Sequence, residues 1–178
     1  MMGEPSFLKA SPSDLEDFFK IELECFDVEA FSKQRYLELL NDPAAISIKA
    51  IVKAQTIGFA IATLERSQQG PLGTVQTLNV RPPFRRIGVG HDLMSRLETE
   101  MRQRGCYKII LQTRVGNSPA INLFTKMGYM RTRLLRNYYD AGISAYEMTK
   151  TLDKTIDTLQ QPEKGHAKNQ PDTTNPSP

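Results

Sequence analysis

The feature that most constrains the fold is an abrupt change of pattern between residues 75 and 101. Residues 75–80 form an apolar, β-favouring run, which ends at Arg81-Pro82-Pro83-Phe84-Arg85-Arg86, and Gly88 and Gly90 follow. A helical pattern then begins, and five apolar residues fall on one of its faces: Val89, Leu93, Met94, Leu97 and Met101. A strand, a glycine-containing loop and a helix in this order aim backbone N–H groups and the positive helix end at one point. This predicts an anion site, and the neighbouring arginines suit the oxygens of a pyrophosphate. A tight turn with solvated arginines is the alternative.

Length and composition limit the class of protein. With 178 residues, 39% of them hydrophobic and 24% charged, the chain is long enough for one soluble domain and too short to expect two. A net charge of +3 suits an anionic ligand as well as nucleic acid. From residue 153 on, three lysines nearly balance four acidic residues, so we expect no specific nucleic-acid partner. No segment approaches the roughly 20 apolar residues of a membrane span, and the first residues lack a secretory pattern. We therefore expect a cytoplasmic protein without a membrane partner.

The two cysteines, Cys25 and Cys106, are too few for a disulfide framework or a zinc cluster. Both stand among apolar neighbours, so we expect them to be small core residues. No metal is predicted.

Strand-like and helix-like segments alternate up to about residue 152. Strands are predicted at residues 7–10, 45–52, 57–64, 74–80, 108–113, 129–135 and 144–152. Helices are predicted to begin near Ser11 and Ser32 and to span 89–104 and 119–127. The first helix should present an apolar stripe: Leu15, Phe18, Phe19, Leu23 and Phe26.

The connections predict how the strands pair. Short polar turns at 53–56 and 65–73 favour an antiparallel meander of the three middle strands. The strands at 74–80 and 108–113 are joined through a helix and should be parallel, which makes an α/β fold with a mixed sheet. The last two strands should flank a loop that contains Tyr138, Tyr139 and residues 140–142. Residues 1–152 are thus predicted to form one domain, and the polar segment 153–178 a disordered tail, because it cannot bury enough surface to offset its ordering entropy.

Three stretches of the sequence resemble a known family. Leu78-Asn79-Val80-x-Pro82-x-Phe84-Arg85-Arg86-x-Gly88-Val89-Gly90 resembles the acetyl-CoA motif of the GCN5-related N-acetyltransferases (the GNAT family). Asn117-Ser118-Pro119-Ala120-Ile121-Asn122-Leu123-Phe124-x-Lys126-x-Gly128-Tyr129 is similar to a second motif of that family, found about as far downstream. A third stretch, Arg136-Asn137-Tyr138-Tyr139 followed by Ala145-Tyr146-x-Met148, resembles the subgroup that acetylates protein N-termini, including ribosomal proteins.

The resemblance implies a GNAT fold of about seven strands and four helices, splayed between the fourth and fifth strands, with acetyl-CoA as cosubstrate. The pantetheine arm would lie in the splay, against backbone groups of Leu78 and Val80. The pyrophosphate would be surrounded by one contiguous set of residues: Arg85, Arg86, Gly88, Val89, Gly90 and His91. Asn117 would either hydrogen-bond the pantetheine or cap the 119–127 helix. Phe124 stands beside the cofactor at the place of the motif's tyrosine and has no proton to give.

The resemblance also suggests catalytic roles. Acetyl transfer to an amine needs a hydrogen-bond donor at the thioester oxygen and an acid for the leaving thiolate. The Val80 N–H fits the first role, and Tyr138 is our candidate for the acid; the alternative is that Tyr138 only packs beside the substrate. Tyr139 would contact the substrate backbone. Gln112 and Thr125 stand where relatives carry a base, so Asp27 and Glu29 are the nearest candidates, and we select Glu29.

The absence of a strong base bears on the substrate. An α-amino group (pKa ~7.8) costs about 1 kcal/mol to deprotonate at pH 7, whereas a lysine side chain (pKa ~10.4) costs about 4.6 kcal/mol. We therefore expect an enzyme that acetylates protein N-termini, possible substrates including ribosomal proteins. A small-molecule amine acetyltransferase of the same fold, or a CoA-binding module without turnover, are the alternatives.

Overall fold

The computed structural model describes residues 3–25, 31–139 and 142–152. Within these ranges one sheet has the strand order β1-β2-β3-β4-β5-β7-β6. Its strands are β1 (Ser6–Lys9), β2 (Ala45–Val52), β3 (Gln55–Ser67), β4 (Gly70–Val80), β5 (Lys108–Arg114), β6 (Met130–Tyr139) and β7 (Ile143–Thr151). Its helices are α1 (Leu15–Cys25), α2 (Lys33–Asn41), α3 (Val89–Gln103) and α4 (Ser118–Lys126), with short 3₁₀ turns at Pro12–Asp14 and Pro82–Phe84. The predicted tail, 153–178, lies outside the described residues.

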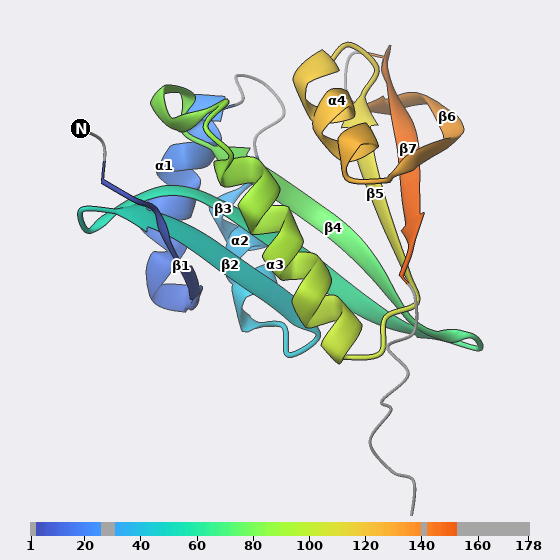
Figure 1. Cartoon of the computed structure of the whole chain (residues 1–178), viewed down its shortest axis with the longest axis horizontal. Coiled ribbons are helices and arrows are strands. Elements are labelled where there is room, and N and C mark those ends of the chain that lie inside the picture. Colours follow the sequence, from blue (N-terminus) through green and yellow to red (C-terminus); the bar gives the residue numbers. More distant parts are fainter. Residues whose placement is uncertain (1–2, 26–30, 140–141, 153–178) are drawn as a thin grey trace, which may run out of the picture.

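The helices form layers on both faces of the sheet. In Figure 1, α3 crosses the near face of β2–β4, whereas α1 and α2 lie behind these strands. One core cluster packs α3 against the sheet and extends to Phe124 and Tyr129 at α4. A second cluster packs α1 and α2 against the other face, where the rings of Phe18 and Phe59 stack with centroids 3.8 Å apart. The helices on the two faces therefore belong to separate cores.

Helix α3 confirms the pattern predicted for it. All five apolar residues of its predicted face are buried, because they recur at the spacing of one helical stripe. Gly88 and Gly105 flank the helix with left-handed φ values of +95° and +76°, which an L side chain adopts at a cost.

The stripe predicted for α1 is partly wrong. Phe18 is buried as predicted, but Leu23 is 54% exposed, and Ile21 and Glu22 are buried instead. The buried face follows the spacing of Phe18, Ile21 and Glu22 (i, i+3 and i+4), which places a carboxylate among apolar neighbours. Phe26, also predicted in the stripe, lies outside the described residues.

The sheet confirms the predicted meander of β2, β3 and β4 and the parallel β4–β5 pair. The connection predicted at 65–73 is much shorter in the structure, because β3 continues to Ser67 and β4 begins at Gly70. Residues 65–67 are exposed, so the ladder of backbone hydrogen bonds runs beyond the apolar core, where hydrophobic patterning gives no signal. In the described part of the chain, no helix has both the length and the apolarity needed to cross a bilayer.

Candidate active site

The sheet opens between β4 and β5. These strands pair only over Leu72–Thr74 and Lys108–Ile110. Beyond this point β4 stays paired with β3 as far as Val80, and β5 stays paired with β7 as far as Arg114. The two strands therefore leave a pair of edges that diverge toward the ends of the strands (Figure 1). The splay predicted between the fourth and fifth strands is present.

A β-bulge in β4 accompanies the opening. The register with β3 changes from Ile61↔Thr77 to Ala62↔Val75, so Gln76 is an extra residue in the ladder. A bulge bends its strand and increases the local twist. Gln76 comes two residues after Thr74, the last β4 residue paired with β5. The bend thus coincides with the place where the strands part.

The backbone of Leu78 and Val80 is directed toward this opening. The Arg81 N–H donates to the Ile57 carbonyl on β3, at 2.9 Å. Because successive residues of a strand alternate the side to which they donate and accept, the N–H groups of Leu78 and Val80 point away from β3, toward β5. The Val80 carbonyl also points away from β3, since it accepts a hydrogen bond from Arg85 Nε at 2.9 Å.

The loop after β4 leads into the N-terminus of α3 at the mouth of the opening. Gly88 and the exposed Arg86 both have left-handed φ values, +95° and +64°. A Cβ on Gly90 would lie 3.8 Å from Val80 Cγ2 and 3.5 Å from Leu123 Cδ2. The first turn of α3 therefore lies close to both β4 and α4, and its N–H groups carry the partial positive charge that binds anions.

The two predicted phosphate-binding arginines have different environments. The Arg85 guanidinium donates to the Val80 carbonyl and, at 3.2 Å, to Cys25 Sγ at the end of α1. Arg86 is exposed, and its backbone has a left-handed φ of +64°.

Cys25, expected in the core, is only half-buried. Burial raises the pKa of its thiol, although Arg85 opposes the shift. Cys106 is buried, as predicted.

The remaining predicted cofactor residues lie around the same end of the sheet. His91 is exposed in the first turn of α3, and its Nδ1 lies 3.2 Å from Asp92 Oδ1. Asn117 caps α4, because its Oδ1 accepts the Ala120 N–H at 3.3 Å. Phe124 is buried, and its ring packs edge-on against Tyr129 with centroids 5.7 Å apart. The capping alternative for Asn117 is thus the arrangement seen in this structure.

Tyr138 and Tyr139 lie in strand β6, not in the loop predicted for them. The ladder between β6 and β7 shifts register between Leu135 and Tyr139, and Asn137 has a left-handed φ of +52°. This irregularity lets the strand continue past its predicted end at Leu135. Tyr138 is 49% exposed, and its ring stands perpendicular to that of Tyr139, with centroids 5.0 Å apart. Asp27 and Glu29 lie outside the described residues.

A buried polar cluster was missed by the sequence analysis. Glu22 on α1, Tyr36 on α2 and Asn79 on β4 are all at most 3% exposed and are joined by hydrogen bonds. The sequence feature that could have indicated it is that Glu22 falls among the apolar residues of one face of α1.

Among the residues that the structure describes, no group of His, Cys, Asp and Glu side chains could hold a metal ion.

Comparison with known proteins identifies the family. A family model described as Acetyltransferase (GNAT) family matches residues 15–129. N-alpha-acetyltransferase 20 of Dictyostelium discoideum is 33% identical over 147 residues, which cover 81% of this chain and 84% of that protein. The chain belongs to the acetyltransferase (GNAT) family. The family predicted from the motifs is thereby confirmed.

Solved structures agree with this GNAT fold. The ribosomal-protein-S18-alanine N-acetyltransferase of Escherichia coli superposes with a TM-score of 0.76 at 21% identity, covering 89% of this chain and 100% of that one. NAA60 of Arabidopsis thaliana, in complex with a bisubstrate analogue, has a TM-score of 0.77 at 20% identity, covering 85% and 100%. At this identity the likeness concerns the fold, and it confirms the predicted mixed α/β sheet. This GNAT protein is an acetyltransferase.

Proposed function

We propose that the protein transfers the acetyl group of acetyl-CoA to the α-amino group of protein N-termini, by direct attack in a ternary complex. The observation that carries the proposal is the unpaired edge of β4, which ends at the exposed N-terminus of α3. An acyl-pantetheine arm needs such an edge, and a pyrophosphate needs such a helix end. The name of the Dictyostelium relative, N-alpha-acetyltransferase 20, supports the α-amino group as acceptor.

In this proposal the phosphates bind to the N–H groups of residues 88–91 and to Arg86, which is exposed beside them. Arg85 would first have to leave the Val80 carbonyl to reach a phosphate, so we assign it the lesser share. Leu78 and Val80 offer their backbone groups to the pantetheine arm. The fit is one of charge as well as shape, because each phosphate oxygen meets N–H donors and a guanidinium.

Asn117 and Phe124 belong to the wall of the proposed cofactor site. Asn117 caps α4 through Oδ1, so its amide nitrogen stays available as a donor to the pantetheine. Phe124 is buried and supports the helix that faces Gly90 through Leu123. Its contribution is packing, because a phenylalanine side chain neither accepts nor donates a proton.

The chemistry requires a neutral amine, a donor at the thioester oxygen and a proton for the departing sulfur. The amine nitrogen forms the new bond to the carbonyl carbon while the carbon–sulfur bond breaks. We assign the hydrogen bond to the carbonyl oxygen to the Val80 N–H and the proton that reaches the sulfur to Tyr138. Tyr139 holds the substrate backbone, and Glu29 receives the proton that the attacking nitrogen loses.

The acceptor follows from the cost of the neutral amine. A protein N-terminus is deprotonated at neutral pH for about 1 kcal/mol, against about 4.6 kcal/mol for lysine. With an N-terminal peptide, kcat/KM should thus rise with pH up to about 7.8 and then level off. We further propose ribosomal proteins among the acceptors and the cytoplasm as the location, since acetyl-CoA and new N-termini occur together there.

Mass spectrometry of a peptide library after incubation with acetyl-CoA tests the proposal. Each peptide should carry an internal lysine and be supplied in two forms, with a free and with a chemically blocked N-terminus. We expect one added acetyl group on the free N-termini and none on the blocked peptides. Acetylation of the blocked peptides, or only of polyamines or antibiotic amines supplied in parallel, would contradict the proposed acceptor.

A further inference from the structure

The Glu22 carboxylate is the centre of the buried cluster between α1, α2 and β4. Its Oε1 accepts the Phe31 backbone N–H at 2.7 Å. Its Oε2 accepts the Tyr36 hydroxyl at 2.7 Å and Asn79 Nδ2 at 2.5 Å. Glu22 itself is 3% exposed. Three donors, one just before α2, one on α2 and one on β4, thus converge on one buried carboxylate.

The three donors are all neutral groups, so loss of any one of their hydrogen bonds would leave the buried Glu22 carboxylate incompletely bonded. A buried charge is tolerated only while its hydrogen bonds are complete. Burial, and then the neighbouring Glu22, raise the pKa of the Tyr36 hydroxyl, so Tyr36 remains a donor at every physiological pH. In the described part of the chain, the salt bridges involve other carboxylates, and none joins Glu22 to a lysine or arginine. The geometry of the three donors therefore depends on the carboxylate.

Two of the three donors are close in sequence to residues of the proposed active site. Asn79 lies on β4 between Leu78 and Val80, whose N–H groups point toward the opening of the sheet. Its Oδ1 is buried and has no hydrogen-bond partner within the described residues, so the amide is oriented by the bonds of Nδ2 to Glu22 and, at 3.4 Å, to the Tyr36 hydroxyl oxygen. Phe31 is the first described residue after residues 26–30, which include the candidate base Glu29. The carboxylate is thus hydrogen-bonded both to the residue before Val80 and to the residue that follows 26–30 in the chain.

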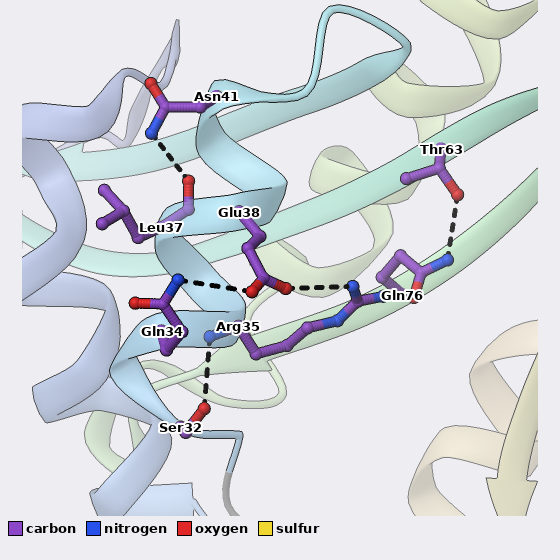
Figure 2. Close-up of polar contacts among 8 residues, drawn as sticks. All are labelled: Ser32, Gln34, Arg35, Leu37, Glu38, Asn41, Thr63 and Gln76. Carbon is purple, nitrogen blue, oxygen red and sulfur yellow. Dashed lines mark hydrogen bonds and ion pairs between the residues drawn. The ribbon is translucent and has the colours of Figure 1, made fainter.

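Helix α2 makes a second contact with strand β4. Arg35, which precedes Tyr36 on α2, donates from Nη2 to Gln76 Oε1 at 3.2 Å, and Gln76 donates to Thr63 Oγ1 at 2.9 Å. Figure 2 shows Arg35 extending from α2 toward Gln76 on β4, with Glu38 beside its guanidinium. Gln76 is the extra residue of the β4 bulge. Helix α2 therefore contacts β4 both at the bulge and, through Tyr36, at Asn79.

We propose that Glu22 is a positioning residue for acetyl transfer. It sets the direction of the Val80 N–H through Asn79, and it touches neither substrate. The inference rests on the proposed function, since the Val80 N–H matters only if it meets the thioester oxygen. Displacement of a reacting group by about 1 Å can cost about 100-fold in rate.

The test is Glu22→Gln, which keeps the size of the side chain and replaces one acceptor oxygen by an NH₂ donor. Either the Phe31 N–H or the Tyr36 and Asn79 donors must then face another donor. We expect kcat with an N-terminal peptide to fall about 10- to 100-fold, while the Kd for acetyl-CoA stays within about twofold, since the proposed phosphate donors belong to residues 86–91 and none of them is bonded to the cluster.

The matched control is Glu98→Gln. Glu98 is another buried carboxylate, 5% exposed, but it lies in the middle of α3 and pairs with Lys150 Nζ at 2.6 Å. This variant should lose thermal stability and keep kcat near wild type. Tyr36→Phe, which removes one donor and keeps the ring, is the milder variant if Glu22→Gln does not fold, and it should lower kcat by a smaller factor.

Wild-type kcat in Glu22→Gln or Tyr36→Phe would overturn the inference. A fall of kcat in Glu98→Gln in proportion to its loss of stability would also overturn it, because the effect would then be general destabilisation. If the wild type acetylates only some other amine, the proposed function fails, and the same comparison is made with that amine. A selective loss in Glu22→Gln would still support the positioning role.

Discussion

Replacing Gly90 with alanine should weaken acetyl-CoA binding without destabilising the protein. Gly90 is the second residue of α3, and its φ is not among the left-handed values. A Cβ would lie 3.5 Å from Leu123 Cδ2 and 3.8 Å from Val80 Cγ2, both ordinary van der Waals distances. Alanine in a helix is about 0.5–1 kcal/mol more stable than glycine. Since about 1 kcal/mol shifts the Tm of such a chain by roughly 2–4 °C, the Tm should stay constant or rise slightly.

The effect on binding has the opposite sign. If the phosphates approach the backbone of the α3 N-terminus, the new methyl group stands in their path and at least one N–H bond to a charged oxygen is lost. A hydrogen bond to a charged group is worth about 1.5–3 kcal/mol. Since about 1.4 kcal/mol corresponds to a factor of ten, the Kd for acetyl-CoA should rise about 10- to 100-fold.

Calorimetric titration with acetyl-CoA and thermal unfolding measure the two effects separately. Gly105→Ala is the matched control: Gly105 lies at the other end of α3, has a φ of +76° and has open space around it. This variant should lose about 1–2 kcal/mol of stability through backbone strain and keep the wild-type Kd. A wild-type Kd in Gly90→Ala would place the phosphates elsewhere and refute the anion site.

Other changes test the remaining assignments. Tyr138→Phe should lower kcat by ~10²–10⁴ with Michaelis constants near wild type, because a positioned general acid is worth about that factor; full turnover with chemistry rate-limiting would contradict its role. Tyr139→Phe should mainly raise the Michaelis constant for the peptide. Arg86→Ala should weaken CoA more than Arg85→Ala and scarcely affect a pantetheine fragment without phosphates, whereas equal losses for both ligands would exclude a phosphate contact. Deleting 160–178 should leave Tm and peptide turnover unchanged, since this polar segment adds no core; a drop of many degrees would show that it docks.

Most of the local structure could be predicted from the sequence. Helix α3 is an example, because the spacing of its apolar residues and the flanking Gly88 and Gly105 depend only on neighbours along the chain. The parallel β4–β5 pair was predictable for the same reason, since a strand–helix–strand connection has one common geometry. The family followed from short motifs whose backbone conformation is local, and the comparisons confirmed it.

Only the tertiary structure decided where segments distant in sequence meet. The extent of β3 and β6 depends on backbone pairing with a partner strand, and exposed residues such as most of those in β6 show no burial pattern that would indicate this pairing. The direction of the Arg85 side chain depends on a carbonyl and a thiol that folding brings to the end of β4. Glu22 is the clearest case. Its sequence neighbours predict a helix surface, but its carboxylate is buried because Phe31, Tyr36 and Asn79 supply the hydrogen bonds that water would otherwise provide.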